Sequence, residues 1–366
     1  MINLSDYLEY EQPTKYIVKS ENYDDSYKTP VLTPGQSFIL GYTNETENIF
    51  PKEKLPIILF DDFTTSVQYV DFPFKVKSSA LKILHAKENA NIKFCYYLLK
   101  SIHINSDTHK RYWISEYSNY QIREFSIDEQ ESIVNKLDLI KSAIENRTNS
   151  LKDNNKYLNS KFIEIFGDIT TNEKEFPIKD LEQIAKIGSS KRIYAKEYVN
   201  SGIPFYRGTE ITELSNGNKP KETLYISEDR YNELKEKYGV PQKGDILITA
   251  VGTVGNTWVV DNDKPFYYKD GNVIQIHLEE TISDIYFKYA LDSLIEDFKY
   301  HNVNGTSYSA LTIDKFKKMK IIIPPIEMQK EFEKIYGLIN EQNKKLMNDI
   351  QDLEKLFDNK LNEYFK

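Results

Sequence analysis

The sequence predicts an α+β chain with two globular mixed α/β domains, each followed by a long amphipathic helix. Two observations support this prediction. The segments 126–166 and 325–365 align without a gap at an offset of 199 residues and share one spacing of apolar residues. Each follows a longer stretch, 1–125 or 170–324, in which short β-type runs alternate with Gly, Asn and Pro turns. The order domain, helix, domain, helix indicates an internal duplication.

The two repeated segments predict helices with a coiled-coil seam. Both seams step by 4-3-4-3-4-3-4-4-3 residues, close to the 3.5-residue spacing of a coiled coil. The seam residues are Ile133, Leu137, Ile140, Ile144, Arg147, Leu151, Asn154, Leu158, Phe162 and Ile165, then Phe332, Tyr336, Ile339, Asn343, Leu346, Ile350, Leu353, Phe357, Leu361 and Tyr364. Polar seam residues are typical of positions that fix register. At 1.5 Å per residue, each helix would be ~60 Å long. The matched pair Ile127-x-x-Gln130 and Ile326-x-x-Gln329 favours duplication over two unrelated helices.

The globular stretches carry weaker signals. An echo at offset 174 matches Asp6 with Asp180, and 28–31 with 202–205. Strand-like runs lie at 57–60, 245–249, 258–260 and 272–276, and helix-like runs at 92–102 and 286–298. Both domains are therefore expected to be mixed α+β.

Composition bounds the class of protein. The chain has 366 residues, of which 40% are hydrophobic, enough for two or three folded domains. Its single cysteine, Cys95, has no partner for a disulfide or a metal site, which indicates a reducing, cytoplasmic location. The first ten residues lack the features of a signal peptide, and no apolar stretch reaches the ~18 residues that span a bilayer. We therefore expect a cytoplasmic protein with no membrane contact.

The net charge of −8 argues against strong unaided binding to nucleic acid, because cationic side chains normally neutralise the phosphates. The net charge is −2 in each of the segments 1–125, 126–169, 170–324 and 325–366, so the negative charge does not come from an acidic tail. Local basic loops can still contact DNA, but we expect weak binding unless partners add positive surface.

Short motifs then connect the chain to a family. The second half contains Gly244-Asp-Ile-Leu-Ile-Thr249, Val251-Gly-Thr-Val-Gly-Asn256, Asn304-Gly-Thr-Ser-Tyr308 and Ile323-Pro-Pro-Ile-Glu-Met-Gln329. The first half contains Pro30-Val-Leu-Thr-Pro-Gly35, Gly41-Tyr-Thr43, Phe60-Asp-Asp-Phe-Thr64 and His109-Lys-Arg-Tyr-Trp113. In this order around a duplicated helix, the motifs resemble the specificity (S) subunit of type I restriction-modification systems over essentially the whole chain. One departure is Ser126, where the family's helix entry has a proline.

The resemblance implies two target recognition domains, 1–125 and 170–324, each reading one half of a bipartite, asymmetric site in double-stranded DNA. It implies that the helices 126–169 and 325–366 pack antiparallel, in a pseudo-twofold repeat, as coiled-coil spacer and docking surface. The implied partners are two methyltransferase (M) subunits, which methylate adenine N6, and restriction (R) subunits bound through them. Half-sites read from one face of B-DNA lie ~34 Å or whole turns apart, which a stiff connector can enforce.

Candidate DNA contacts are polar and basic residues of the predicted loops, because base edges are read by side-chain donors and acceptors and phosphates by cations. In the first domain they are Lys28, Thr43, Thr64, Thr65, Ser66, Lys75, Lys77, Ser78, His109, Lys110, Arg111 and Tyr112. In the second domain they are Lys191, Arg192, Tyr194, Arg207, Thr209, Gly252, Thr253, Gly255, Asn256, Asn304, Thr306, Ser307 and Tyr308.

Each candidate group also has a plainer interpretation. The segment 249–256 is equally typical of an ordinary β-turn, the basic clusters of solvated surface, and 304–308 of an N-capping turn. The acidic pair Asp61 and Asp62 can accept a hydrogen bond from cytosine or cap a turn, and the second is commoner. Lys75 and Lys77 are expected to share one face of a strand, which favours phosphate contact.

The sequence offers no catalytic motif. Ile323-Pro-Pro-Ile326 lacks the preceding polar residue and the following aromatic that adenine methyltransferases use, and no GxxxxGK(S/T) loop occurs. The five histidines show no zinc spacing. We therefore expect no enzyme activity, no metal and no cofactor. Three alternatives stay open: the recognition subunit of a related multisubunit restriction enzyme, a coiled-coil scaffold that binds protein, which the net charge suits, and, least supported, a nuclease.

Overall fold

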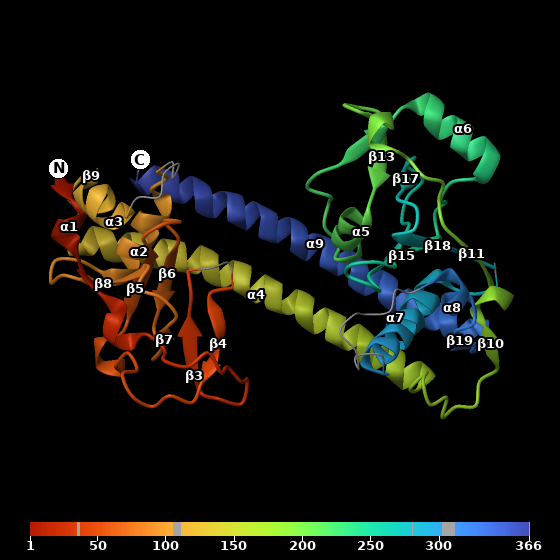
Figure 1. Cartoon of the computed structure of the whole chain (residues 1–366), viewed down its shortest axis with the longest axis horizontal. Helices are drawn as coiled ribbons and strands as arrows, with labels where there is room; N and C mark the ends of the chain where they lie inside the picture. Colours follow the sequence, from red (N-terminus) through yellow and green to blue (C-terminus); the bar gives the residue numbers. More distant parts are fainter. Residues whose placement is uncertain (35–36, 105–110, 280, 302–311, 366) are drawn as a thin grey trace. The chain divides into compact units, whose positions relative to one another are not determined.

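A computed structural model describes residues 1–34, 37–104, 111–279, 281–301 and 312–365 (Figure 1). The chain forms two compact units: Met1–Asn149 with Leu346–Lys366 is unit 1, and Ser150–Lys345 is unit 2. Each unit contains a globular domain and part of each of two 40-residue helices, α4 (Ile127–Phe166) and α9 (Ile326–Phe365). The predicted mixed architecture with two long helices is confirmed.

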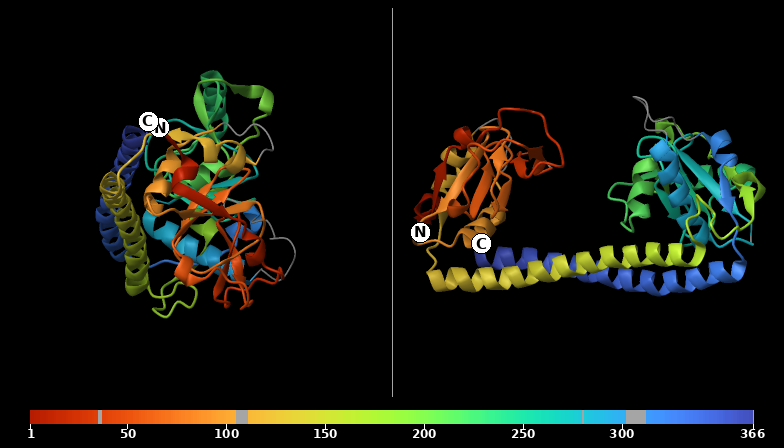
Figure 2. Two further views of the ribbon diagram at one scale, coloured as in Figure 1. Left: turned by 90° about the vertical axis from the view of Figure 1, so that its left-hand side faces the viewer. Right: turned by 90° about the horizontal axis from the view of Figure 1, so that it is seen from below.

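The bounds of α4 and α9 differ by 199 residues at both ends, as the repeat predicts. None of the predicted seam residues is exposed. In unit 1 the start of α4 meets the end of α9, where Leu137 and Leu361 belong to one core cluster. In unit 2 the end of α4 meets the start of α9, with 5.4 Å between the ring centroids of Phe162 and Phe332. The two helices are therefore antiparallel (Figure 2).

Two polar seam residues pair with each other. Nδ2 of Asn154 donates a hydrogen bond to Oδ1 of Asn343 at 2.7 Å, and both side chains are half-buried. A shift of one helix along the other would separate these amides and place them against apolar side chains. The pair therefore specifies the register of the seam.

We expect the double variant Asn154→Leu with Asn343→Leu to be more stable than either single variant by about 1 to 2 kcal/mol. Each single change leaves one half-buried amide without its partner, whereas the double change completes the apolar seam. Urea unfolding of the four proteins measures the coupling. Asn135→Leu, at an exposed position of α4, is the control and should be near neutral. Strictly additive single effects would contradict the expectation.

Unit 1 contains nine strands and three short helices in its described domain residues. The strands are β1 (Ile2–Asn3), β2 (Leu8–Glu11), β3 (Thr29–Leu32), β4 (Ile39–Thr43), β5 (Ile57–Asp61), β6 (Val67–Val70), β7 (Lys75–Val76), β8 (Leu81–Ala86) and β9 (Gln121–Ile122). The helices are α1 (Leu4–Tyr7), α2 (Ile92–Ser101) and α3 (Tyr112–Ser115). The sheets have the orders β2-β8-β5-β6, β4-β3-β7 and β1-β9.

Unit 2 repeats this plan. Its strands are β10 (Ile178–Asp180), β11 (Ala185–Gly188), β12 (Tyr198–Val199), β13 (Ile203–Tyr206), β14 (Leu224–Ile226), β15 (Ile246–Thr249), β16 (Thr257–Val259), β17 (Tyr267–Tyr268), β18 (Val273–Leu278) and β19 (Lys320–Ile322). Its helices are α5 (Gly208–Ser215), α6 (Glu228–Tyr238), α7 (Asp284–His301) and α8 (Ile313–Lys317). The sheets have the orders β11-β18-β15-β16, β12-β14-β13-β17 and β10-β19. The predicted helices 92–102 and 286–298 are confirmed as α2 and α7.

The sheets confirm one part of the weaker echo and correct the other. β3 pairs in parallel with β7, and β13 with β17, so that Val31 and Phe205 are equivalent at the predicted offset of 174. The match of Asp6 with Asp180 is wrong. Asn3 and Asp180 are equivalent, because each ends the strand paired to β9 or β19 and precedes a short helix. The connection to β3 is three residues longer than the connection to β13, which hides this match in the sequence.

The repeated Ile-x-x-Gln motif ties each long helix to its own domain. Oε1 of Gln130 accepts from the amide N of Asn91, which caps α2, at 2.8 Å, and Nε2 donates to the main-chain oxygen of Phe125 at 3.1 Å. Oε1 of Gln329 accepts from the amide N of Ser283, which precedes α7, at 2.9 Å, and Nε2 donates to the oxygen of Pro324 at 2.8 Å. Both glutamines are fully buried.

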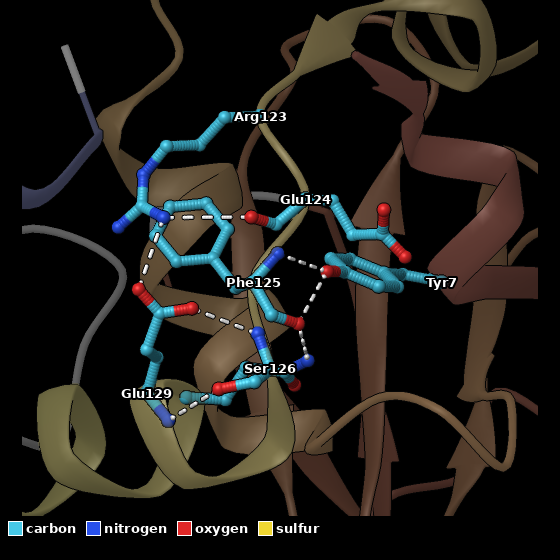
Figure 3. A network of polar contacts seen from close by, with 7 residues as sticks. Tyr7, Arg123, Glu124, Phe125, Ser126 and Glu129 are labelled. Carbon is cyan, nitrogen blue, oxygen red and sulfur yellow. Dashed lines mark hydrogen bonds and ion pairs between the residues drawn. The ribbon is translucent and has the colours of Figure 1, made fainter.

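The start of α4 is fixed by hydrogen bonds around Ser126. The amide N of Ser126 donates to Oε2 of Glu129 at 2.9 Å, and the amide N of Glu129 donates to Oγ of Ser126 at 3.3 Å, which is a capping box (Figure 3). The hydroxyl of Tyr7 donates to the main-chain oxygen of Phe125 at 2.9 Å and accepts from its amide N at 2.8 Å. Ser126 is therefore the N-cap residue of α4.

Candidate nucleic-acid interface

The loops after β5 and β15 occupy the same place in their domains. β5 lies between β8 and β6, and β15 lies between β18 and β16. Directly after each central strand, the amide N of Asp62 donates to the oxygen of Ala80 at 3.1 Å, and that of Ala250 donates to the oxygen of Asn272 at 2.8 Å. We call the segments 62–66 and 250–256 hairpin loops 1 and 2. Sequence patterns predicted DNA contacts in both without relating them to each other.

Hairpin loop 1 is held by the carboxylate of Asp61. This group accepts hydrogen bonds from the amide N of Phe63 at 3.0 Å and from the hydroxyl of Thr64. Thr65 has a positive φ of 59°, which turns the chain back toward β6. Asp61 is 2% exposed, so it caps the turn and has no surface for cytosine. Thr64 and Ser66 remain exposed, and Thr65 is half-buried.

A buried ion pair fastens hairpin loop 1 to unit 1. Nζ of Lys82 lies 3.4 Å from Oδ2 of Asp62, and the two side chains are 1% and 2% exposed. Oδ1 of Asp62 accepts from the amide N of Trp113 at 2.8 Å, and its main-chain oxygen accepts from the amide N of Tyr112 at 3.0 Å. Arg111, which precedes Tyr112 and is exposed, therefore lies directly beside hairpin loop 1.

Three predicted contacts of the first domain are corrected, because Thr43, Lys75 and Tyr112 are buried. Nζ of Lys75 lies 2.8 Å from Oε2 of Glu45 and donates to the main-chain oxygen of Glu47 at 2.9 Å. A buried side chain offers no surface to a base or a phosphate. These three residues stabilise the domain instead.

The remaining candidates of the first domain surround hairpin loop 1 or lie at the surface. Lys77 and Ser78 are half-buried in the β7–β8 turn, which accepts the hydrogen bond from Asp62. Nζ of Lys77 is paired with the exposed Glu21. Lys28 is exposed. The predicted contacts His109, Lys110, Asn304, Thr306, Ser307 and Tyr308 lie outside the described residues.

The two glycines of hairpin loop 2 have different roles. Gly252 has a φ of 80°, and a Cβ atom there would meet no atom within 4 Å, so its backbone is open to a ligand. Gly255 has a φ of 94°, and a Cβ atom there would lie 2.4 Å from Cγ2 of Ile295 in α7. The predicted close approach to phosphate therefore suits Gly252, whereas Gly255 permits packing against α7.

Helix α5 supports hairpin loop 2. The hydroxyl of Thr212 accepts from Nδ2 of Asn256 at 2.9 Å and lies 3.3 Å from the hydroxyl oxygen of Thr253. At the start of α5, Arg207 binds the carboxylate of Glu210, which is 1% exposed, with 2.5 Å between Nη2 and Oε1. Arg207 is thereby committed to this pair. The hydroxyls of Thr253 and of Thr209, at the start of α5, are exposed.

The segment 189–194 lies against the β17–β18 turn. Nε of Arg192 donates to Oδ2 of Asp270 in that turn at 2.8 Å. The same turn accepts the hydrogen bond from hairpin loop 2 through Asn272. Lys191, Arg192 and Tyr194 are all exposed. The structure therefore brings together basic residues and a hydroxyl-bearing loop that are about 60 residues apart in the chain.

Lys269 is a basic residue of this surface that the sequence analysis missed. Its amide N donates to the oxygen of Tyr206 at 2.8 Å, just as the amide N of Lys77 donates to the oxygen of Leu32 at 2.8 Å. Each lysine follows the strand that pairs in parallel with β13 or β3. The two lysines are therefore equivalent, in turns that adjoin hairpin loops 2 and 1. The strands before them, β7 and β17, are too short to be aligned by pattern.

A polar cavity of about 300 Å³ lies at the other end of β15. In it, Nδ1 of His277 lies 2.7 Å from Oδ1 of Asp245, but the hydroxyl of Ser283 is bonded to Glu333 at 3.1 Å. The cavity therefore pairs no hydroxyl with the imidazole. Within the described ranges, no group of three or more His, Cys, Asp or Glu is arranged for a metal ion. Among those residues, no helix has the length and hydropathy to cross a membrane.

Comparison with known proteins gives consistent matches. Residues 173–352 match the family model of the type I restriction modification DNA specificity domain. The chain is 49% identical over 123 residues to the Escherichia coli type I restriction enzyme EcoR124I/EcoR124II specificity subunit, covering 32% of this chain and 30% of that one. It is 36% identical over 165 residues to the putative Haemophilus influenzae type I restriction enzyme specificity subunit S.HindORF215P, covering 43% and 40%. These matches span less than half of either relative.

The fold agrees over a longer range. The structure of the type I restriction-modification system S subunit from M. genitalium aligns with a TM-score of 0.58 at 17% identity, over 100% of this chain and 95% of that one. A match at this level of identity shows a similar fold only. The matched family domain lies in unit 2 and in the first part of α9. Together, these findings show that the chain contains a type I restriction modification DNA specificity domain at residues 173–352 and that its fold is similar to that of a specificity subunit over its whole length.

Proposed function

We propose that this chain selects a bipartite, asymmetric site in double-stranded DNA, with the domains 1–125 and 170–324 each reading one half. The observation that carries this proposal is the equivalence of hairpin loops 1 and 2. A duplicated reading loop with different residues in each copy, Thr64 and Ser66 in one and Thr253 and Asn256 in the other, suits two unlike half-sites. The chain contributes no catalytic group and acts in the cytoplasm.

The net charge of −8 means that the chain alone is expected to bind DNA weakly. Of the cations beside hairpin loop 2, Arg192 is paired with Asp270 and Arg207 with Glu210. Because phosphate neutralisation supplies much of the affinity for DNA, the chain needs partners with positive surface. In our proposal these are two methyltransferase (M) subunits that methylate adenine N6, with restriction (R) subunits bound through them.

Repeat-related apolar residues on the long helices support two docking sites. Leu139 and Leu338 are 74% and 72% exposed, and Tyr157 and Leu356 are 46% and 42% exposed. The members of each pair are 199 residues apart, and each unit carries one member of each pair. Two equivalent patches fit two copies of one partner. The helices, 126–169 and 325–366, are thus proposed as spacer and docking surface.

The position of Leu139 around its helix agrees with this role. It follows Gln130, which is bound to the domain, by nine residues, or two and a half turns of an α-helix. It therefore projects from the side of α4 opposite to the domain. Leu338 follows Gln329 by the same nine residues.

We expect Leu139→Asp and Leu338→Asp each to remove one of two bound methyltransferase subunits, and the double variant to remove both. An aspartate in a buried apolar contact carries an uncompensated charge. Native mass spectrometry of the co-expressed complex counts the subunits. Ile163→Asp is the control, because Ile163 is 59% exposed on α4 but its repeat counterpart is Asn362. Unchanged stoichiometry in the double variant would refute the docking assignment.

Methylation mapping tests the proposed function as a whole. The chain is co-expressed with the methyltransferase encoded beside it, and the host genome is sequenced for N6-methyladenine. One split motif, two short half-sites around an unspecified gap, is the expected result. An assembled complex that methylates no split motif would overturn DNA selection in favour of a protein-binding scaffold.

The cations beside hairpin loop 2 should affect affinity rather than choice of sequence. We expect Lys191→Gln, Arg192→Gln and Lys269→Gln together to reduce the slope of log affinity against log salt by roughly 2 to 3, at about 0.9 for each lost phosphate contact. The matched control removes three cations elsewhere in unit 2, at Lys179, Lys235 and Lys237. Binding of the complex to its mapped duplex is measured over a salt series. Equal slopes for both triple variants would contradict the expectation.

A further inference from the structure

Each hairpin loop exposes one large apolar side chain. Phe63 in loop 1 is 44% exposed, and Val251 in loop 2 is 49% exposed. Both lie two residues past the end of the central strand, which is Asp61 in β5 and Thr249 in β15. The two side chains therefore occupy equivalent positions in the two domains.

Neither side chain packs into the core of its own domain. The core clusters of the described residues include Phe60 and Ile248 from the preceding strands, but not Phe63 or Val251. The backbone of Phe63 is fixed, because its amide N donates to Oδ1 of Asp61 at 3.0 Å. Single exposed apolar residues are common on protein surfaces. Two at equivalent points of a duplicated loop indicate a retained use.

The surroundings favour contact with bases. Exposed hydroxyls flank each apolar residue, from Thr64 and Ser66 in loop 1 and from Thr253 in loop 2. The major groove of B-DNA is ~12 Å wide, enough for a two-stranded β-ribbon and hence for the loop that joins β5 to β6, whereas the minor groove is only ~6 Å wide. The apolar group that bases display in the major groove is the C5-methyl of thymine.

We propose that Phe63 and Val251 each contact the C5-methyl group of a thymine, one in each half-site, while the neighbouring hydroxyls bond to adjacent base edges. This inference rests on the proposed function and names the bases at one position of each half. Phenylalanine and valine differ in length and volume. The two loops would therefore approach their thymines to different depths in the groove and would prefer different flanking bases.

Deoxyuridine provides the direct probe, since it pairs like thymidine but lacks the methyl group. Once the site is mapped, affinities of the complex with methyltransferase are compared for the natural duplex and for duplexes with dU in one half-site at a time. We expect about a 4-fold loss from dU at the contacted position, the effect of burying one methyl-sized group. Phe63→Ala should abolish the difference in the first half-site only, and Val251→Ala in the second only.

The crossed design contains its own controls. Each alanine variant must still distinguish dU from thymidine in the half-site read by the other domain, which shows that it is folded and assembled. A half-site without thymine, equal binding of dU and thymidine by the wild-type complex, or discrimination that survives the matching alanine variant would overturn the inference.

Any of these results with a specific split site leaves the proposed function standing. Absence of any specific site removes the proposed function itself. Loss of complex assembly on Phe63→Ala, without a dU effect, would assign the side chain to a protein contact and overturn the inference.

Discussion

Replacing Gln329 with methionine is expected to destabilise unit 2 by about 2 to 6 kcal/mol, although the two side chains have similar volume. Gln329 is 1% exposed, and its amide satisfies the amide N of Ser283 and the oxygen of Pro324. Methionine leaves both main-chain groups buried and unbonded, at roughly 1 to 3 kcal/mol each. In unit 1, Gln130→Met removes the bonds to the amide N of Asn91 and the oxygen of Asn89, whereas the oxygen of Phe125 keeps its bond from Tyr7. We therefore expect a loss of similar size there.

Hydrogen exchange locates these effects. Gln329→Met should lower the protection of α7, and Gln130→Met that of α2, because each glutamine bonds at the start of one of these helices. Gln342→Met is the control, since Gln342 is exposed on α9. A uniform loss of protection in both units, or a loss no larger than that of the control, would show that the motif does not tie each long helix to its own domain.

Replacing Lys82 with methionine is expected to destabilise unit 1 by about 3 to 5 kcal/mol and to impair recognition of the first half-site only. The change leaves the carboxylate of Asp62 buried without its cation, which is the costly way to break a buried ion pair. Asp62 also bonds to Trp113 and Tyr112, so hairpin loop 1 loses its fixed position.

A second substitution separates charge from packing. Asp62→Asn keeps an oxygen for the amide N of Trp113 but carries no charge, so Lys82→Met with Asp62→Asn should recover most of the lost stability. Urea unfolding and methylation mapping of the two variants are the measurements, with Lys100→Met, at an exposed position of α2, as control. If the double variant is as unstable as Lys82→Met, the loss of stability does not come from the uncompensated charge of Asp62.

Periodic features were predictable from the sequence. Both long helices end where the repeat places them, and all their seam residues are at least half-buried, because a heptad pattern reports directly on a buried stripe. The helices α2 and α7 begin and end within three residues of the predicted helix-like runs. The antiparallel pairing followed from the family resemblance and not from the residues.

The interface was less predictable, because loops have no period. Hairpin loops 1 and 2 differ in length and share only an apolar residue and a threonine, and the sheet order with the equivalent hydrogen bonds of Asp62 and Ala250 identifies them as one feature. Alternation along a strand placed Lys75 and Lys77 on a common face. β7 ends at Val76, however, so Lys77 lies beyond the strand while Lys75 points into the domain and pairs with Glu45.

Unit 1 combines the first 149 residues with the end of α9, so it cannot complete its fold until α9 has been synthesised. Its core is completed by the last turns of α9, where the ring centroid of Phe365 lies 5.4 Å from that of Phe94 and 6.2 Å from that of Phe125. On the ribosome, the first domain emerges more than 200 residues before these turns. At 5 to 20 residues per second this is a delay of roughly 10 to 40 s. The newly made domain must therefore wait with part of its apolar surface in water, exposed to chaperones and proteases, until unit 2 has been synthesised.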